Sequence, residues 1–179
     1  MGSARIELTQ GDITRSDTTA IANAANSMLM GGGGVDGAIH RAAGPELLQA
    51  LREVKRTLAG GVLATGKAVL TPGFKLQARY VIHCVGPIYD REGKRAQELL
   101  ASCYAEALRL CEEHSIDSIA FPSISTGVYG YPVDEAAPVA LRALAERLPE
   151  LPTVELCRFV LFDRATFTAY ERAAQQIFR

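Results

Sequence analysis

The order of the predicted strands and helices constrains the fold of this chain more than any other feature of its sequence. From residue 80 onward, short apolar runs alternate with long amphipathic segments in the order strand, helix, strand, helix, strand, helix. Strands that alternate with helices require right-handed crossovers, which build a largely parallel sheet covered on both faces. The sequence therefore predicts an α/β fold, a three-layer α/β/α sandwich with a mixed, largely parallel sheet.

The expected elements cover most of the 179 residues. Strands are predicted at residues 5–10, 20–25, 67–71, 80–85, 118–122 and 154–162, and helices at residues 35–43, 46–58, 96–114, 133–148 and 166–178. We expect the amino-terminal strands to supply any antiparallel edge. Pro138 should kink its helix or mark a later start. Because the sequence contains no linker or internal repeat, we expect a single domain over residues 1–179.

Composition and charge limit the classes of function. The net charge of −1 provides no global field to attract a polyanion, so nucleic-acid binding is disfavoured and any bound anion must be held by local backbone dipoles. The sequence has no apolar run of membrane-spanning length and no targeting signal, so we expect a cytoplasmic protein without membrane contacts. The four cysteines lack metal-binding spacing and lie in apolar stretches, which predicts reduced core thiols and no metal; they are Cys84, Cys103, Cys111 and Cys157.

Two short motifs suggest nucleotide folds that their context excludes. Gly32, Gly34 and Gly37 satisfy the pattern GxGxxG, but they follow a loop and not the first strand of a βαβ unit. Residues 61–67 nearly form a phosphate-binding P-loop, but Ala68 replaces the required Ser or Thr and a helix precedes the motif. We interpret the first motif as part of a ligand loop and the second as a turn.

Three loops are candidates for ligand binding, at residues 11–14, 26–37 and 123–131. Ligands of open α/β sheets bind at the carboxyl ends of the strands, where all three loops should fall. Four consecutive glycines at 31–34 and the small residues of 123–131 both suit backbone amides that surround an anion. Two such loops facing each other indicate a diphosphate.

Four polar residues beside these loops are candidates for chemistry, although each also has a purely structural explanation. Asp36 can cap a helix, but it also places a carboxylate beside whatever the glycines bind. His40 shares the face of Asp36 and is either a structural histidine or a catalytic one. Asn26 can bind a hydroxyl, and Asp12 either caps a turn or accepts hydrogen bonds from a base.

Several motifs together resemble one family over nearly the full length of the chain. They are Gly11-Asp12-Ile13-Thr14, Asn23-Ala24-Ala25-Asn26, Gly31 to Gly34 with Val35-Asp36-Gly37, His40-Arg41-Ala42-Ala43-Gly44, Tyr80-Val81-Ile82-His83 with Val85-Gly86-Pro87, Ala120-Phe121-Pro122, and Ser125-Thr126-Gly127 with Tyr129-Gly130. With these motifs the chain resembles a macrodomain of the MacroD type. The resemblance implies that the ligand is ADP-ribose.

The same resemblance implies a role for each matched residue. Asp12 and Ile13 would contact the adenine, with Phe162 packed on its face. Asn26 would bind the distal ribose and Asp36 would act beside its anomeric carbon, with His40 a further catalytic candidate. The diphosphate would be held by backbone amides of Gly33, Gly34, Val35, Ser125, Thr126, Gly127, Val128 and Tyr129, and Tyr129 would also shape the distal ribose pocket.

The reaction implied by the resemblance is hydrolysis of an ester on ADP-ribose. Its substrates would be O-acetyl-ADP-ribose and proteins mono-ADP-ribosylated on Asp or Glu. The chain lacks the Cys and His cluster of zinc-dependent macrodomains, so we expect no metal and no other cofactor, and we expect a monomer. The alternatives are a non-catalytic reader that binds ADP-ribose, and an RNA-binding or regulatory protein on the same fold.

Overall fold

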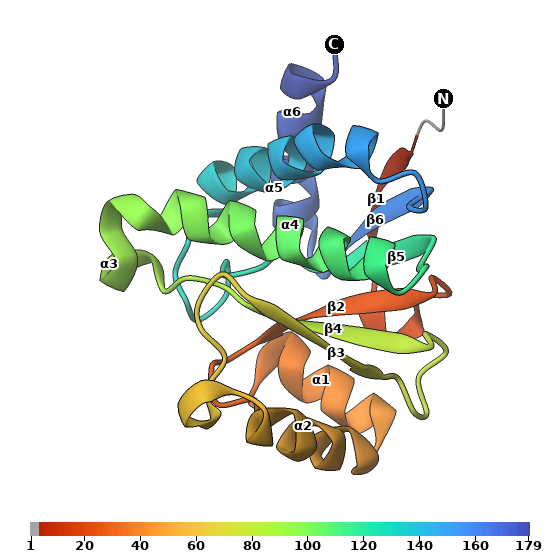
Figure 1. Cartoon of the computed structure of the whole chain (residues 1–179). Helices are drawn as coiled ribbons and strands as arrows, with labels where there is room; N and C mark the ends of the chain where they lie inside the picture. Colours follow the sequence, from red (N-terminus) through yellow and green to blue (C-terminus); the bar gives the residue numbers. More distant parts are fainter. Residues whose placement is uncertain (1–3) are drawn as a thin grey trace.

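The computed structural model describes residues 4–179 and contains one six-stranded sheet (Figure 1). The strands are β1 (Arg5–Gln10), β2 (Ala20–Ala25), β3 (Ala68–Pro72), β4 (Tyr80–Val85), β5 (Ser118–Phe121) and β6 (Leu156–Leu161). Their order across the sheet is β1-β6-β5-β2-β4-β3, and every pair is parallel except β3 with β4. The predicted mixed, largely parallel sheet is confirmed.

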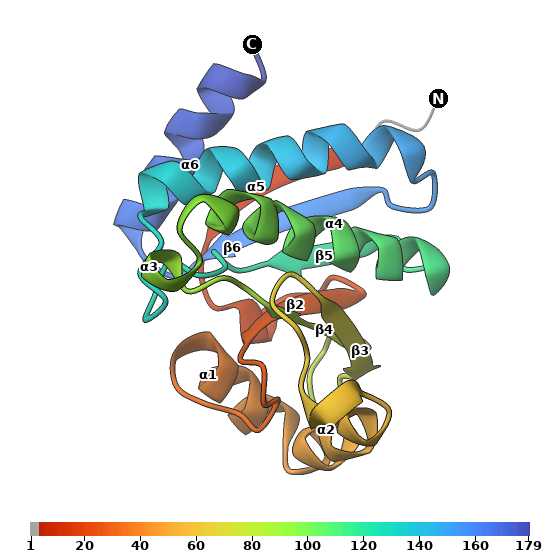
Figure 2. The same cartoon turned by 60° about the vertical axis from the view of Figure 1, so that its left-hand side comes forward.

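Helices cover both faces of the sheet, as the alternation of elements predicts (Figures 1 and 2). On one face lie α1 (Gly34–Ala43) and α2 (Glu46–Arg56), and on the other lie α4 (Ala96–Glu113), α5 (Val133–Arg147) and α6 (Arg164–Ile177). The sequence prediction missed the short helix α3 (Tyr89–Glu92) and the 3₁₀ turns, which are Ile13–Arg15, Ala59–Gly61, Gly93–Arg95 and Leu148–Glu150.

Each face of the sheet has its own apolar core, because side chains along a strand alternate between the faces. In β2, Ala20 and Ala22 pack toward α4 and α5, whereas Ile21 packs toward α1 and α2. Asn23 follows Ala22 in the same strand and is completely buried on the α1 face. A polar side chain is therefore placed inside the smaller core, where it needs hydrogen-bond partners.

The expected antiparallel edge is wrong in its position. β1 and β2 are both parallel to their neighbours, and the antiparallel edge is β3. Only residues 73–79 connect β3 to β4, which is too short for a crossover, so the chain must reverse direction there. Gly73 permits this turn, since a Cβ at that position would collide with the carbonyl oxygen of Ala78.

Pro138 neither ends α5 nor delays its start. The helix begins at Val133 and continues to Arg147, with Pro138 in its second turn. The proline removes one hydrogen bond to the carbonyl of Asp134, an exposed residue in the first turn of the helix. A later start of this helix is therefore wrong.

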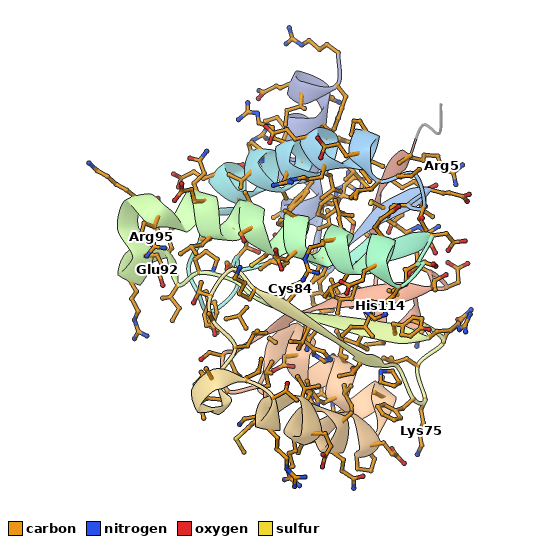
Figure 3. The ribbon with its side chains drawn as sticks, viewed as in Figure 1. Arg5, Lys75, Cys84, Glu92, Arg95 and His114 are labelled. Atoms are coloured by element: carbon orange, nitrogen blue, oxygen red, sulfur yellow. The ribbon has the colours of Figure 1, made fainter. Side chains whose placement is uncertain are left out.

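The cysteines are buried and free, as predicted. Burial raises the pKa of the Cys103 thiol to about 12, and the pKa of Cys84 is raised for the same reason, so neither forms a reactive thiolate. Figure 3 places Cys84 in the interior beneath α4, whereas the imidazole of His114 lies at the exposed end of that helix.

Across residues 4–179, no helix is long and apolar enough to span a membrane.

Candidate active site

A cleft of about 670 Å³ opens at the carboxyl ends of the five mutually parallel strands. It is lined by the residues that end or follow these strands, which are Gly11, Ala25, Gly86, Pro122 and Phe162. The three candidate loops converge here, as expected for an open α/β sheet. The volume is in the range of small-molecule sites.

The amino end of α1 forms one wall of the cleft. Gly33 caps this helix of ten residues, and Gly34 begins it with a φ of 57° that favours glycine. A Cβ at either Gly33 or Gly34 would meet nothing within 4 Å, so the backbone is open to the cleft. The first amides of a helix have no partner within it, and together with the helix dipole they favour an anion.

The loop at 123–131 forms the opposite wall. Ser125 has a φ of 69°, which is unusual for a residue other than glycine, and its carbonyl accepts a 2.9 Å hydrogen bond from the Tyr131 amide. The hydroxyl of Tyr170 donates to Ser123 Oγ at 3.0 Å and anchors the start of the loop. In the described part of the chain, the backbone amides of residues 125–129 have no protein acceptor. Both walls thus present free amides to the cleft.

Asp36 is the buried charge at the bottom of the site. The residue is only 5% exposed, and its Oδ1 accepts a 2.8 Å hydrogen bond from Asn23 Nδ2. His40 Nε2 lies 3.4 Å from the same oxygen. Burial raises the pKa of Asp36, and this effect outweighs the opposing hydrogen bond from Asn23 and the charge of His40. A carboxyl with a raised pKa is suited to general-base chemistry.

Asn26 lies beside Asp36 and holds the glycine loop in place. Its Oδ1 accepts from the amides of Met28 and Leu29, both at 3.1 Å, and its Nδ2 donates to the carbonyl of Gly31 at 3.0 Å. A Cβ at Gly32 would lie 3.3 Å from Asp36 Oδ2 and 3.5 Å from Asn26 Nδ2, so both polar groups border that glycine. Asn26 keeps one amide hydrogen available for a ligand.

The opposite end of the cleft suits a flat apolar group with polar edges. Phe162 follows β6 with 86% of its surface exposed, and the buried Ile13 lines the same cleft. Asp12 caps the turn at residues 13–15 through Thr14, whose two hydrogen bonds lower the pKa of Asp12. Both interpretations of Asp12 are thus compatible with its position, because it caps the turn and also lines the cleft.

The structure brings the predicted site residues together in this one cleft, apart from His40. His40 does not line the cleft, but its Nε2 lies close to Asp36 Oδ1. Sequence reasoning gave no role to Asn23, His83 and Arg41. The sequence did contain a signal for Asn23, because it is a polar residue within a predicted strand, residues 20–25, of otherwise apolar residues. Arg41 is the one cationic side chain among the residues that line the cleft in the described chain.

No group of three or more His, Cys, Asp or Glu side chains within residues 4–179 could hold a metal ion. The lining is acidic at both ends, through Asp12 and Asp163 at one end and Asp36 at the other. An anion in the middle of the cleft must therefore be stabilised chiefly by the backbone amides of the two walls.

Comparison with known proteins identifies the family of this chain. Residues 22–140 match the family model described as Macro domain, and the chain belongs to the macro domain family. A Streptomyces griseus protein named as macro domain-containing is 49% identical over 166 residues, covering 93% of this chain and 92% of its own. The O-acetyl-ADP-ribose deacetylase of Salmonella typhimurium is 47% identical, and the match covers 97% of this chain and 96% of that protein. A mutant Oceanobacillus iheyensis macrodomain with ADPR is 46% identical, with a TM-score of 0.94 and coverage of 97% and 93%.

Proposed function

We propose that this protein binds ADP-ribose and hydrolyses esters attached to its distal ribose. The substrates are O-acetyl-ADP-ribose and proteins that carry mono-ADP-ribose on Asp or Glu. The observation that supports this proposal most directly is a buried carboxylate, Asp36, at the end of a cleft whose middle is lined by two sets of free amides. The name of the Salmonella relative supports the deacetylase part of the proposal.

We place ADP-ribose in the cleft in one direction. The adenine lies between Phe162 and Ile13, where Asp12 accepts a hydrogen bond from its amino group. The diphosphate lies between the amides of 33–35 and 125–129, which supply hydrogen bonds without the desolvation cost of a buried charged side chain. The distal ribose then reaches Asn26, Asp36 and Tyr129.

In this orientation Asp36 acts as the general base. It takes a proton from a water molecule, the oxygen of the water adds to the ester, and the ester C–O bond breaks. The proton held by Asp36 then passes to the departing oxygen. The nearby diphosphate further disfavours the ionised carboxylate, so its pKa rises further when the substrate binds. Such a base contributes about two to four powers of ten to the rate.

The test compares wild-type protein with Asp36→Ala on O-acetyl-ADP-ribose and on a protein ADP-ribosylated on acidic residues. We expect Asp36→Ala to lose turnover and to keep its affinity for ADP-ribose, measured by calorimetry. Asp134→Ala is the matched control, because Asp134 is an exposed carboxylate outside the cleft. Full turnover by Asp36→Ala would exclude Asp36 as the base.

The same measurements separate the alternatives. A wild-type protein that binds ADP-ribose and leaves both esters intact would be a non-catalytic reader. Thermal melts with ADP-ribose, AMP, NAD and RNA test the binding step, since ligand at about 100 times its dissociation constant adds roughly 2.7 kcal/mol. A melting shift with RNA alone would contradict the proposed function.

A further inference from the structure

A chain of buried polar side chains leads from Asp36 to the edge of the sheet. Asn23 Nδ2 lies 2.8 Å from Asp36 Oδ1 and also 3.2 Å from His83 Nδ1. On the far side of the ring, His83 Nε2 lies 2.9 Å from Thr71 Oγ1. Asn23 and His83 are completely buried, and Thr71 is 1% exposed. This row of hydrogen-bonded side chains crosses three neighbouring strands, β2, β4 and β3.

Strand register places these groups in line. Asn23 in β2 is the direct partner of His83 in β4, so both side chains lie on the α1 face of the sheet. Thr71 reaches the other nitrogen of the ring from the antiparallel strand β3. None of the three contacts the cleft directly, since none of them lines it. They can affect the chemistry only through Asp36.

The carboxylate determines the direction of every hydrogen bond in this chain. An ionised Asp36 only accepts, so Asn23 must turn its NH₂ group toward it. The same nitrogen then donates its second hydrogen to His83 Nδ1, which must therefore carry a lone pair. A neutral ring with a lone pair on Nδ1 has its hydrogen on Nε2, and that hydrogen is donated to Thr71. The Thr71 hydroxyl in turn donates to the carbonyl of Pro72 at 3.1 Å.

His83 remains neutral at the pH where the site works. Burial lowers its pKa from 6.5 to about 3, with a smaller contribution from the charge of His40. A neutral ring has a single N–H, so this arrangement gives a partner to each polar atom of these side chains except Asn23 Oδ1, which has no hydrogen-bond partner among the described residues. Rotation of the Asn23 amide would place its oxygen against the carboxylate and is therefore disfavoured.

We propose that His83, held in its Nε2–H form by Thr71, is a positioning residue that orients Asn23 and thereby the carboxylate of Asp36. The consequence concerns the two oxygens of Asp36. Oδ1 is occupied by Asn23 and faces His40, whereas Oδ2 lies beside Gly32 on the side of the glycine loop. Holding Oδ1 leaves Oδ2 to face the reacting water. This inference rests on the proposed role of Asp36 as the base.

Thr71→Val tests the proposal, because it removes the hydroxyl and keeps the shape of the side chain. We expect kcat for O-acetyl-ADP-ribose to fall about fivefold, the rate equivalent of one neutral hydrogen bond. The dissociation constant for ADP-ribose should stay within about twofold, since Thr71 lies outside the cleft. Thr71→Ser restores the hydroxyl and should recover kcat. Equal kcat values in the wild type and Thr71→Val would overturn the proposal.

A second measurement does not depend on activity. The chain has three histidines, so ¹⁵N NMR of labelled protein can resolve the ring of His83, and His114→Gln assists its assignment. The wild type should show a neutral ring with its proton on Nε2 between pH 5 and pH 8, and Thr71→Val should show a mixture of the two neutral forms. A proton on Nδ1 of His83 in the wild type would refute its positioning role, even if Asp36→Ala shows that Asp36 is the base. If the Asp36 variants kept their turnover while the His83 ring still carried its proton on Nε2, the proposed function of Asp36 would be refuted.

Discussion

Phe162 provides the clearest quantitative prediction about ligand binding. Phe162 follows β6 and is 86% exposed, so its side chain contributes little to the stability of the folded protein. It lines the cleft, and in the proposed binding mode it stacks on the adenine. Stacking of a base on an aromatic ring contributes about 1–3 kcal/mol. Phe162→Ala should therefore weaken ADP-ribose binding by roughly 5- to 150-fold.

Folding should not change in the same variant, because truncation of an exposed side chain alters stability by no more than about 0.5 kcal/mol. Urea unfolding measures this value and calorimetry measures the affinity. Phe178→Ala is the matched control, since Phe178 is a partly exposed phenylalanine outside the cleft. It should bind ADP-ribose like the wild type.

Ribose 5-phosphate separates stacking from a general disturbance of the site. This fragment lacks the adenine, so the wild type and Phe162→Ala should bind it equally. Unchanged affinity of Phe162→Ala for ADP-ribose would refute the assignment of this end of the cleft to the base. Equal losses for ADP-ribose and for the fragment would show that Phe162 shapes the loop and does not stack.

Two further predictions concern the residues around Asp36. Gly37→Ala should lower the free energy of unfolding by about 1–3 kcal/mol in urea titrations, because its Cβ would lie 2.5 Å from the Gly32 carbonyl oxygen. Gly33→Ala, whose Cβ meets nothing, should fold normally, and equal stability of the two variants would contradict this reasoning. Stability should also fall on acidification from about pH 6.5 toward pH 3, because the unfolded chain protonates His83 and the folded chain does not. In this range His83 contributes about 1.4 kcal/mol to the free energy of unfolding per pH unit. If the stability of His83→Asn fell with pH as steeply as that of the wild type, His83 would titrate normally.

The sequence was sufficient to predict the layers of the fold and most of the cleft. Both follow from local patterns, namely the alternation of strands and helices and the small residues at the strand ends. The position of the antiparallel edge was missed, although the short connection at residues 73–79 between β3 and β4 was a local signal for it. The pairing of β2 with β4 and β5 was not predictable in this way, because these partners are separated by long stretches of chain.

By itself, the sequence determined that this chain folds as an α/β sandwich with glycine-rich loops at one edge of its sheet, and that Asn26 and Asp36 border the glycine run. Only the tertiary structure decided that Asn23, His83 and Thr71 form one chain behind Asp36. Each of these residues comes from a different strand, and its neighbours in sequence do not reveal its partners. Burial of the assembled chain also raises the pKa of Asp36 and lowers that of His83, because desolvation exists only once the sheet and α1 have packed.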